Sequence, residues 1–140
     1  MKSPVTIGPI ELRPVDQLVA YANNARTHSE AQIDQIVSSI KEFGFTNPIL
    51  IDPDNVIIAG HARLRAVRKL GCQQVEVRVL AHLSKTQRRA LAIADNQLAL
   101  NAGWDEELLR AELAALKEEG YDLDVLGFDN GELASSIDRG

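Results

Sequence analysis

Apolar residues recur along the chain at helical spacing in some segments and at strand spacing in others, and this predicts the elements. The segment after Ser29 follows the 3.6-residue period of a helix, and Ser29 with Gln32 forms a capping box at its start. Ser84 with Gln87 forms a second capping box, which opens a helix that runs to about Leu100. The apolar faces expected for these two helices are Ile33, Ile36, Val37, Ile40 and Phe43 in the first, and Leu91, Ile93, Ala94 and Leu98 in the second.

Short β-branched runs predict the strands. Residues 10–12 form one, and residues 48–52 and 56–59 flank a polar turn, which favours a hairpin. Residues 75–79 alternate apolar and polar positions, as a half-buried strand does. A helix over residues 64–70 separates the hairpin from that strand. Strands and helices in this order predict an α+β fold, a small mixed sheet flanked by helices.

The charge divides the chain into two parts, and we expect domain boundaries to match. Residues 1–104 hold 12 Lys/Arg and 9 Asp/Glu, whereas residues 105–140 hold 3 and 11, so the balances are +3 and −8. We expect 1–104 to form the α+β domain. Residues 105–140 are expected to form an acidic helical extension that packs on it through an apolar stripe. An anionic partner for the basic part is one reading of the split, and solvated helix faces are the other.

Composition places limits on the class of protein. The 140 residues are 45% hydrophobic and 25% charged, which is typical of a globular domain. No apolar run approaches the ~18 residues that a membrane span requires, so no membrane role is expected. The single Cys72 can form neither an internal disulfide nor a cysteine metal cluster, which favours a reducing cytoplasm and no bound metal.

The candidate chemistry lies where an apolar run ends at Gly60 and a cation-rich helix begins. A helix N-terminus offers free N–H groups, and a glycine there lets a ligand approach the backbone. Arg63 lies in the first turn and could clamp an oxyanion, while His61 could donate a hydrogen bond or move a proton. The pattern indicates a phosphate site, although a simple turn would give the same pattern.

A second polar feature is Asp95-Asn96, which interrupts an alanine- and leucine-rich helix. The pair could face solvent or a ligand. If the protein is an enzyme, His61 and Asp95 are the candidate catalytic residues.

The order of these motifs resembles the N-terminal domain of the ParB family, in the ParB/sulfiredoxin superfamily. The resemblance covers about residues 10–100. Its four motifs are Asn24-Ala25-Arg26 for the family's Asn-Pro-Arg turn, Ser39-Ile40 with Gly44 and Pro48-Ile49 for its S-I-x-x-x-G-x-x-x-P-I box, Gly60 to Ala66 for its G-E-R-R-x-R-A box, and Asp95-Asn96 for its Glu-Asn box.

The resemblance implies a bound nucleotide (CTP, ATP or ADP), which a Mg²⁺ ion could accompany. Gly60, His61, Arg63, Arg26 and Asn96 would then hold its phosphates. Position 61 is His and position 62 is Ala, where the partition proteins carry Glu and Arg and where sulfiredoxin carries a cysteine at the first. The Gly-His-x-Arg version resembles nucleotide-using serine kinases and, more closely, the ParB-like domains fused to DNA methyltransferases.

DNA is the expected macromolecular partner. The candidate DNA-binding residues are Arg65, Arg68, Lys69, Lys85, Arg88 and Arg89. A fused methyltransferase domain or a homodimer would fit the same resemblance. Two other functions remain open on the sequence: a DNA nuclease or nucleotide-dependent small-molecule kinase, and a protein-interaction domain.

Overall fold

The computed structural model describes residue 5, residues 8–22 and residues 27–128. The chain divides into two compact units, residues 1–99 and residues 100–140. No helix in the described part is long and apolar enough to cross a membrane.

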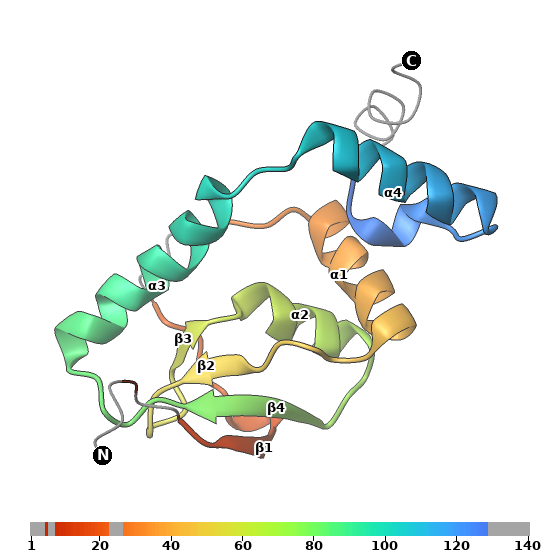
Figure 1. The fold of residues 1–140 in the computed structure, drawn as a ribbon. Coiled ribbons are helices and arrows are strands. Elements are labelled where there is room, and N and C mark those ends of the chain that lie inside the picture. Colours follow the sequence, from red (N-terminus) through yellow and green to blue (C-terminus); the bar gives the residue numbers. More distant parts are fainter. Residues whose placement is uncertain (1–4, 6–7, 23–26, 129–140) are drawn as a thin grey trace. The chain divides into compact units, whose positions relative to one another are not determined.

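The first unit is built on a four-stranded sheet in the order β1-β4-β2-β3 (Figure 1). The strands are β1 (Ile10–Pro14), β2 (Ile49–Ile51), β3 (Ile57–Ala59) and β4 (Gln74–Val79). β1 pairs with β4 and β2 with β3 in antiparallel fashion, while β2 and β4 are parallel. The sheet is therefore mixed and the fold is α+β, as the sequence predicted.

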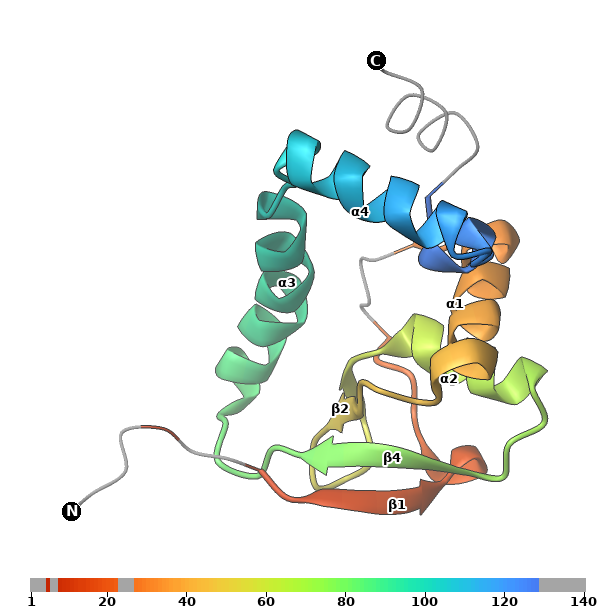
Figure 2. The ribbon, with the colours of Figure 1, turned by 45° about the vertical axis from the view of Figure 1, so that its right-hand side comes forward.

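Helices lie over one face of this sheet in two layers (Figure 2). α2 (His61–Lys69) packs on β2, and α1 (Glu30–Phe43) packs on α2. Ser29 caps α1, since its Oγ accepts from the N–H of Gln32 at 3.1 Å. A short 3-10 helix, η1 (Val15–Gln17), follows β1. α3 (Lys85–Asn101) completes the unit and begins with a full capping box, in which Ser84 and Gln87 exchange hydrogen bonds of 2.8 and 3.1 Å.

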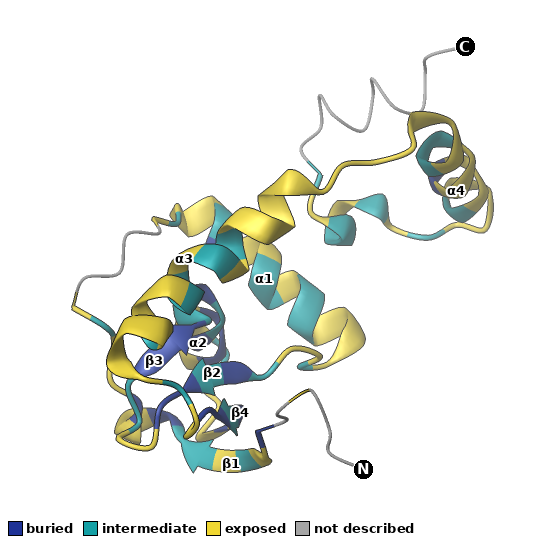
Figure 3. Cartoon of the chain, turned by 60° about the vertical axis from the view of Figure 1, so that its left-hand side comes forward, coloured by how far each residue is buried: buried dark blue, intermediate teal, exposed yellow. Residues whose placement is uncertain are grey.

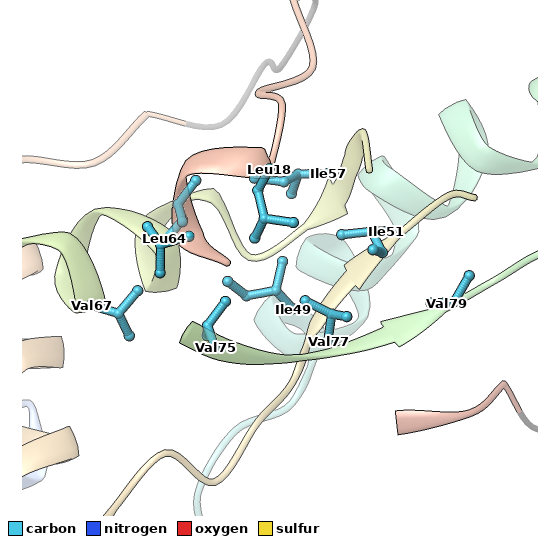
Figure 4. Close-up of a cluster of buried hydrophobic side chains, with 10 residues drawn as sticks. Leu18, Ile49, Ile51, Ile57, Leu64, Val67, Val75, Val77 and Val79 are labelled. Carbon is cyan, nitrogen blue, oxygen red and sulfur yellow. The ribbon is translucent and has the colours of Figure 1, made fainter. Parts of the chain in front are cut away.

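The core lies between the sheet and α2 (Figure 4). The alternation of β4 places Val75, Val77 and Val79 on this side, and Leu64 and Val67 of α2 meet them. Figure 3 shows the buried residues gathered on β2, β3 and α2. A second cluster joins the two helix layers, because Ile33 of α1 packs against Ala62 and Ala66 of α2. Small residues on α2 let α1 approach closely.

The second unit contains α4 (Glu106–Glu118) and a 3-10 helix, η2 (Leu123–Leu126). Asp105 caps α4, and Leu113 is its buried residue. The rings of Trp104 and Phe128 lie with centroids 5.8 Å apart, which closes the unit on itself. Packing of this segment on the first unit stays a prediction.

Three details of the sequence prediction are wrong. α2 begins at His61 rather than at residue 64, because Gly60 supplies the N-cap conformation. Phe43 was expected on the apolar face of α1, but it lies on the last turn of the helix and is exposed. Ile93 and Leu98 are also exposed, at 67% and 68%. All seventeen residues of α3 are described and none is buried, although Leu91 and Ala94 are half-buried.

A matched pair of substitutions tests whether α1 contributes to the core while α3 does not. Ile33→Ala empties a fully buried position, so we expect a loss of ~2–5 kcal/mol in the free energy of unfolding. Ile93→Ala removes the same atoms from an exposed position and should change stability by less than ~0.5 kcal/mol. Urea unfolding followed by circular dichroism measures both. Equal losses in the two variants would contradict the assigned core.

Candidate functional site

Gly60 joins β3 to α2 in a conformation that favours glycine. Its φ and ψ are 109° and 22°, in the left-handed region. Its carbonyl accepts the first helical hydrogen bond, from the N–H of Leu64 at 3.0 Å. The N–H groups of the first turn after Gly60 have no carbonyl partner within the helix, and the helix dipole adds positive potential there. The junction is a suitable place for an anion.

Arg63 lies across this junction. Its Nη2 donates to the carbonyl of Pro48 at 3.1 Å. A Cβ at residue 60 would lie 3.1 Å from Nη2 and 3.2 Å from Nε, so the guanidinium rests on the bare Cα of Gly60. Nε is buried and has no hydrogen-bond partner among the described residues. Burial lowers the pKa of Arg63, and the nearby Asp95 carboxylate raises it in part; the guanidinium stays charged at neutral pH.

His61 is fixed by a backbone group. Its Nε2 accepts from the N–H of Tyr21 at 3.1 Å. An imidazole nitrogen that accepts a hydrogen bond carries no proton, so the neutral ring holds its proton on Nδ1. Burial, and then the neighbouring His28, lower the pKa of His61, which favours this neutral form. His61 is therefore arranged as a donor through Nδ1, and Nε2 could act as a base only after the bond to Tyr21 breaks.

These residues line one cavity of about 170 Å³, which we call the Gly60 cavity. Asp95 and Asn96 of α3 also line it. The Asn96 amide nitrogen donates to the carbonyl of Ala92 at 3.1 Å, which orients the side chain. The remaining lining residues are His28, Ile36, Ile58, Ala59 and Ala62. The structure thus brings together five of the six residues predicted for phosphate binding or catalysis, and Arg26 lies outside the described residues.

The cations predicted for DNA binding separate into groups. Arg65 forms an ion pair with Glu30, and Lys69 pairs with Glu30 at 3.1 Å and with Asp34 at 2.5 Å. Hydrogen bonds from the Lys69 ammonium to Asp34 and Glu30 raise its pKa. Arg65 and Lys69 therefore link α2 to α1, while Arg68 is exposed on α2.

Lys85, Arg88 and Arg89 lie on the first turns of α3 and line a second cavity of about 200 Å³. We call it the Asp52 cavity, after the buried carboxylate in its wall. From the sequence, Asp52 was only the last residue of the first run that flanks the polar turn, and no binding role was predicted for it. No role was predicted for Tyr21 either, whose contribution to the Gly60 cavity is a backbone N–H that carries no sequence signal. His28 was also missed, although its place just before the Ser29 cap puts it beside the helix that borders the site.

Comparison with known proteins assigns the family. The sequence model of the ParB N-terminal domain matches residues 6–97. The chain belongs to the ParB N-terminal domain family. The sequence model of the ParB-methyltransferase HTH domain matches residues 107–139. The segment that we expected to be only an acidic helical extension thus resembles a helix-turn-helix module, and α4 is its described helix.

Relatives within this family differ in length. The chain is 50% identical over 80 residues to the ParB-like nuclease domain-containing protein YnaK of Escherichia coli K12, covering 57% of this chain and 92% of YnaK. It is 34% identical over 74 residues to the probable chromosome-partitioning protein ParB of Campylobacter jejuni, covering 51% of this chain and 26% of that protein. The chain thus spans about a quarter of the partition protein.

Solved structures share the ParB fold. C-terminally truncated ParB from Caulobacter crescentus, complexed with CTP-gamma-S, has a TM-score of 0.75 at 22% identity, covering 93% of this chain and 77% of that chain. Sulfiredoxin from Arabidopsis thaliana has a TM-score of 0.50 at 21% identity, covering 59% of this chain and 97% of that one. These likenesses confirm the predicted ParB/sulfiredoxin fold.

Gly60→Ala tests whether the Arg63 guanidinium depends on the absence of a side chain at residue 60. A side chain there meets a positive φ and the Arg63 guanidinium together, so we expect a loss of ~1–3 kcal/mol in stability and a displaced Arg63. Gly71→Ala is the control, since φ is 77° there but no atom lies within 4 Å of the added Cβ. Urea unfolding with phosphate-ligand calorimetry compares them. The loss of ligand binding should occur in Gly60→Ala and not in Gly71→Ala. Equal ligand affinities in the two variants would contradict a role for the contact between Gly60 and Arg63 in ligand binding.

His61 predicts a dependence of stability on pH. Its pKa is lowered in the folded state, so the unfolded chain takes up its proton first as the pH falls below ~6.5. Stability should therefore decrease as the pH falls from that value toward the folded pKa, and protonation of Nε2 would also break the bond to Tyr21. His61→Gln keeps an acceptor but cannot titrate, so its stability should fall less between pH 7.5 and 5.5. Unfolding in urea across this range, with exposed His82→Gln as control, measures the difference. Identical pH slopes for the parent and His61→Gln would rule out the effect.

Proposed function

We propose that this chain is a ParB-type module of a DNA-associated protein, and that its Gly60 cavity binds the phosphate groups of a nucleotide. One observation carries the proposal. Arg63 Nε is buried close to a helix N-terminus and has no hydrogen-bond partner among the described residues, and it lies beside Gly60, which carries no side chain. A buried donor of this kind lacks a hydrogen bond that an anion would supply.

The residues around Arg63 fit a phosphate group. The first-turn N–H groups of α2 and the Nδ1–H of His61 are further donors, and all of them are neutral or positive. Ile36 and Ile58 give the cavity an apolar side that suits a base or a ribose edge. Asp95 is the carboxylate of the lining, so a Mg²⁺ ion would be held by Asp95 together with the phosphates. The CTP-gamma-S complex of the Caulobacter relative supports a nucleotide as the ligand class.

A kinase or hydrolase function would need a base at this cavity. His61 Nε2 is occupied by the Tyr21 N–H, which leaves Asp95 as the free candidate. Nucleotide binding therefore uses donors that are already in place, whereas turnover would depend on Asp95 as the base.

Association with DNA is supported by the helix-turn-helix match and by the cations of α3. Arg65 and Lys69 are neutralised by acidic residues of α1, so they are poor candidates for phosphate contacts. We therefore assign the contacts of the first unit with DNA to Lys85, Arg88 and Arg89. The match to the ParB-methyltransferase HTH domain supports a methyltransferase as the fused or associated activity.

Calorimetry with CTP, ATP, ADP and inorganic phosphate tests the site. Arg63→Ala should weaken binding by ~1.5–3 kcal/mol, the range for a hydrogen bond to a charged group. Arg63→Lys should recover only part of this, because an ammonium cannot reproduce the guanidinium fork. Arg68→Ala removes an exposed arginine from the same helix and should bind as the parent does. If Arg63→Ala binds each phosphate ligand as tightly as the parent, the junction is only a turn.

A further inference from the structure

The Asp52 cavity is distinct from the Gly60 cavity, although both are bordered by β3 and α3. Its floor is apolar, formed by Val56, Ile58 and Ala92 among others. Tyr21 is the aromatic residue of its lining. An apolar hollow with an aromatic wall fits a flat ring better than it fits a hydrated ion.

Asp52 gives this cavity a hydrogen-bond acceptor. The residue is 7% exposed. Its Oδ1 accepts from the N–H of Asp54 at 2.8 Å and from the N–H of Val56 at 3.0 Å, which closes the β2–β3 turn. Its Oδ2 lies 3.7 Å from Arg88 Nε, beyond hydrogen-bond distance. The turn therefore uses one oxygen, and the other is left on the side of α3 for a donor.

Three cations line the same cavity as that acceptor. Lys85, Arg88 and Arg89 project from the first turns of α3, against the single carboxylate of Asp52. Arg88 also donates to the carbonyl of Leu83 at 3.3 Å, which holds its guanidinium near the cavity. Lys85 and Arg89 are exposed at the rim. The cavity thus combines an apolar floor and a buried acceptor with a positively charged rim.

We infer that the Asp52 cavity holds an unpaired, amino-bearing nucleobase of single-stranded nucleic acid. The base lies on the apolar floor, its exocyclic amino group donates to Asp52 Oδ2, and the flanking phosphates contact Lys85 and Arg89. A base within a duplex is stacked and paired, so only an unpaired base can enter a hollow of this kind. This inference extends the proposed association with DNA and does not require the phosphate site at Gly60.

The acceptor predicts a preference among bases. Cytosine presents an amino donor at the position where thymine presents a carbonyl oxygen, and a carboxylate accepts from the first and repels the second. Fluorescence anisotropy of labelled oligo-dC and oligo-dT decamers with the full chain at pH 7.5 measures this preference. We expect the parent to bind oligo-dC about tenfold more tightly, equivalent to one good hydrogen bond.

Asp52→Asn is the decisive variant. Its amide oxygen can keep both bonds of the turn, so the amide nitrogen must replace Oδ2 and the acceptor becomes a donor. The preference should therefore shift toward oligo-dT. Arg89→Ala should weaken binding of both oligonucleotides and reduce the slope of log K against log salt by about 0.7, because it removes one phosphate contact. Lys41→Ala, in the last turn of α1, removes an exposed cation outside the proposed sites and should match the parent.

Each outcome decides the inference. Equal affinities for oligo-dC and oligo-dT in the parent, or a preference that Asp52→Asn leaves unchanged, would overturn it. Failure to bind either oligonucleotide would also overturn it, and would favour a protein side chain as the occupant. If dCMP alone competes as strongly as the decamer, the ligand is a free nucleotide and the single-strand assignment is wrong. Nucleotide calorimetry on Arg63→Ala reports the Gly60 cavity separately, so failure of one site does not imply failure of the other.

Discussion

The arrangement of the candidate site depends on the contact between the side chain of Arg63 and Gly60, a residue without a side chain. The Arg63 guanidinium lies on the Cα of Gly60 because no Cβ occupies that space. The same glycine adopts the positive φ that lets α2 start directly after β3. One residue therefore sets the direction of the helix, exposes its first N–H groups and fixes the cation that faces them. The core below reinforces this geometry, since Leu64 and Val67 bury the opposite side of α2.

α3 is attached to the first unit in a different manner. None of its residues is buried, and its contacts with the rest of the unit include the Arg88–Asp52 ion pair at 3.7 Å. Yet α3 contributes to both cavities, through Asp95 and Asn96 in one and through Lys85 and Arg89 in the other. A helix held by polar contacts and little buried apolar area is less costly to displace than one held by a core. A ligand in either cavity would therefore be expected to affect the position of α3.

Much of the fold could be predicted because its signals are local. The capping pairs at Ser29 and Ser84, and the alternation over β4, appear in the structure where the sequence placed them. The Gly60 cavity was predicted in large part because its motif is contiguous and its partner, Asp95-Asn96, stands out in an apolar context. Which apolar positions of α3 are covered could not be predicted, because helical spacing gives the face of a helix and not its neighbour. The neutralisation of Arg65 and Lys69 and the Arg88–Asp52 pairing were also missed, since they join residues more than thirty positions apart.

The pairing of β1 has a consequence for how the chain reaches this structure. Within the sheet, β1 is hydrogen-bonded to β4 alone, so residues 10–14 find their partners only at residues 74–78. The parallel pairing of β2 with β4 likewise joins two strands that are separated in the sequence by β3 and α2. Non-local pairings of this kind slow folding, because the chain loses the entropy of loop closure before the stabilising contacts form. During synthesis the first strand must wait until β4 has emerged from the ribosome, while the β2–β3 hairpin can form earlier from neighbouring residues.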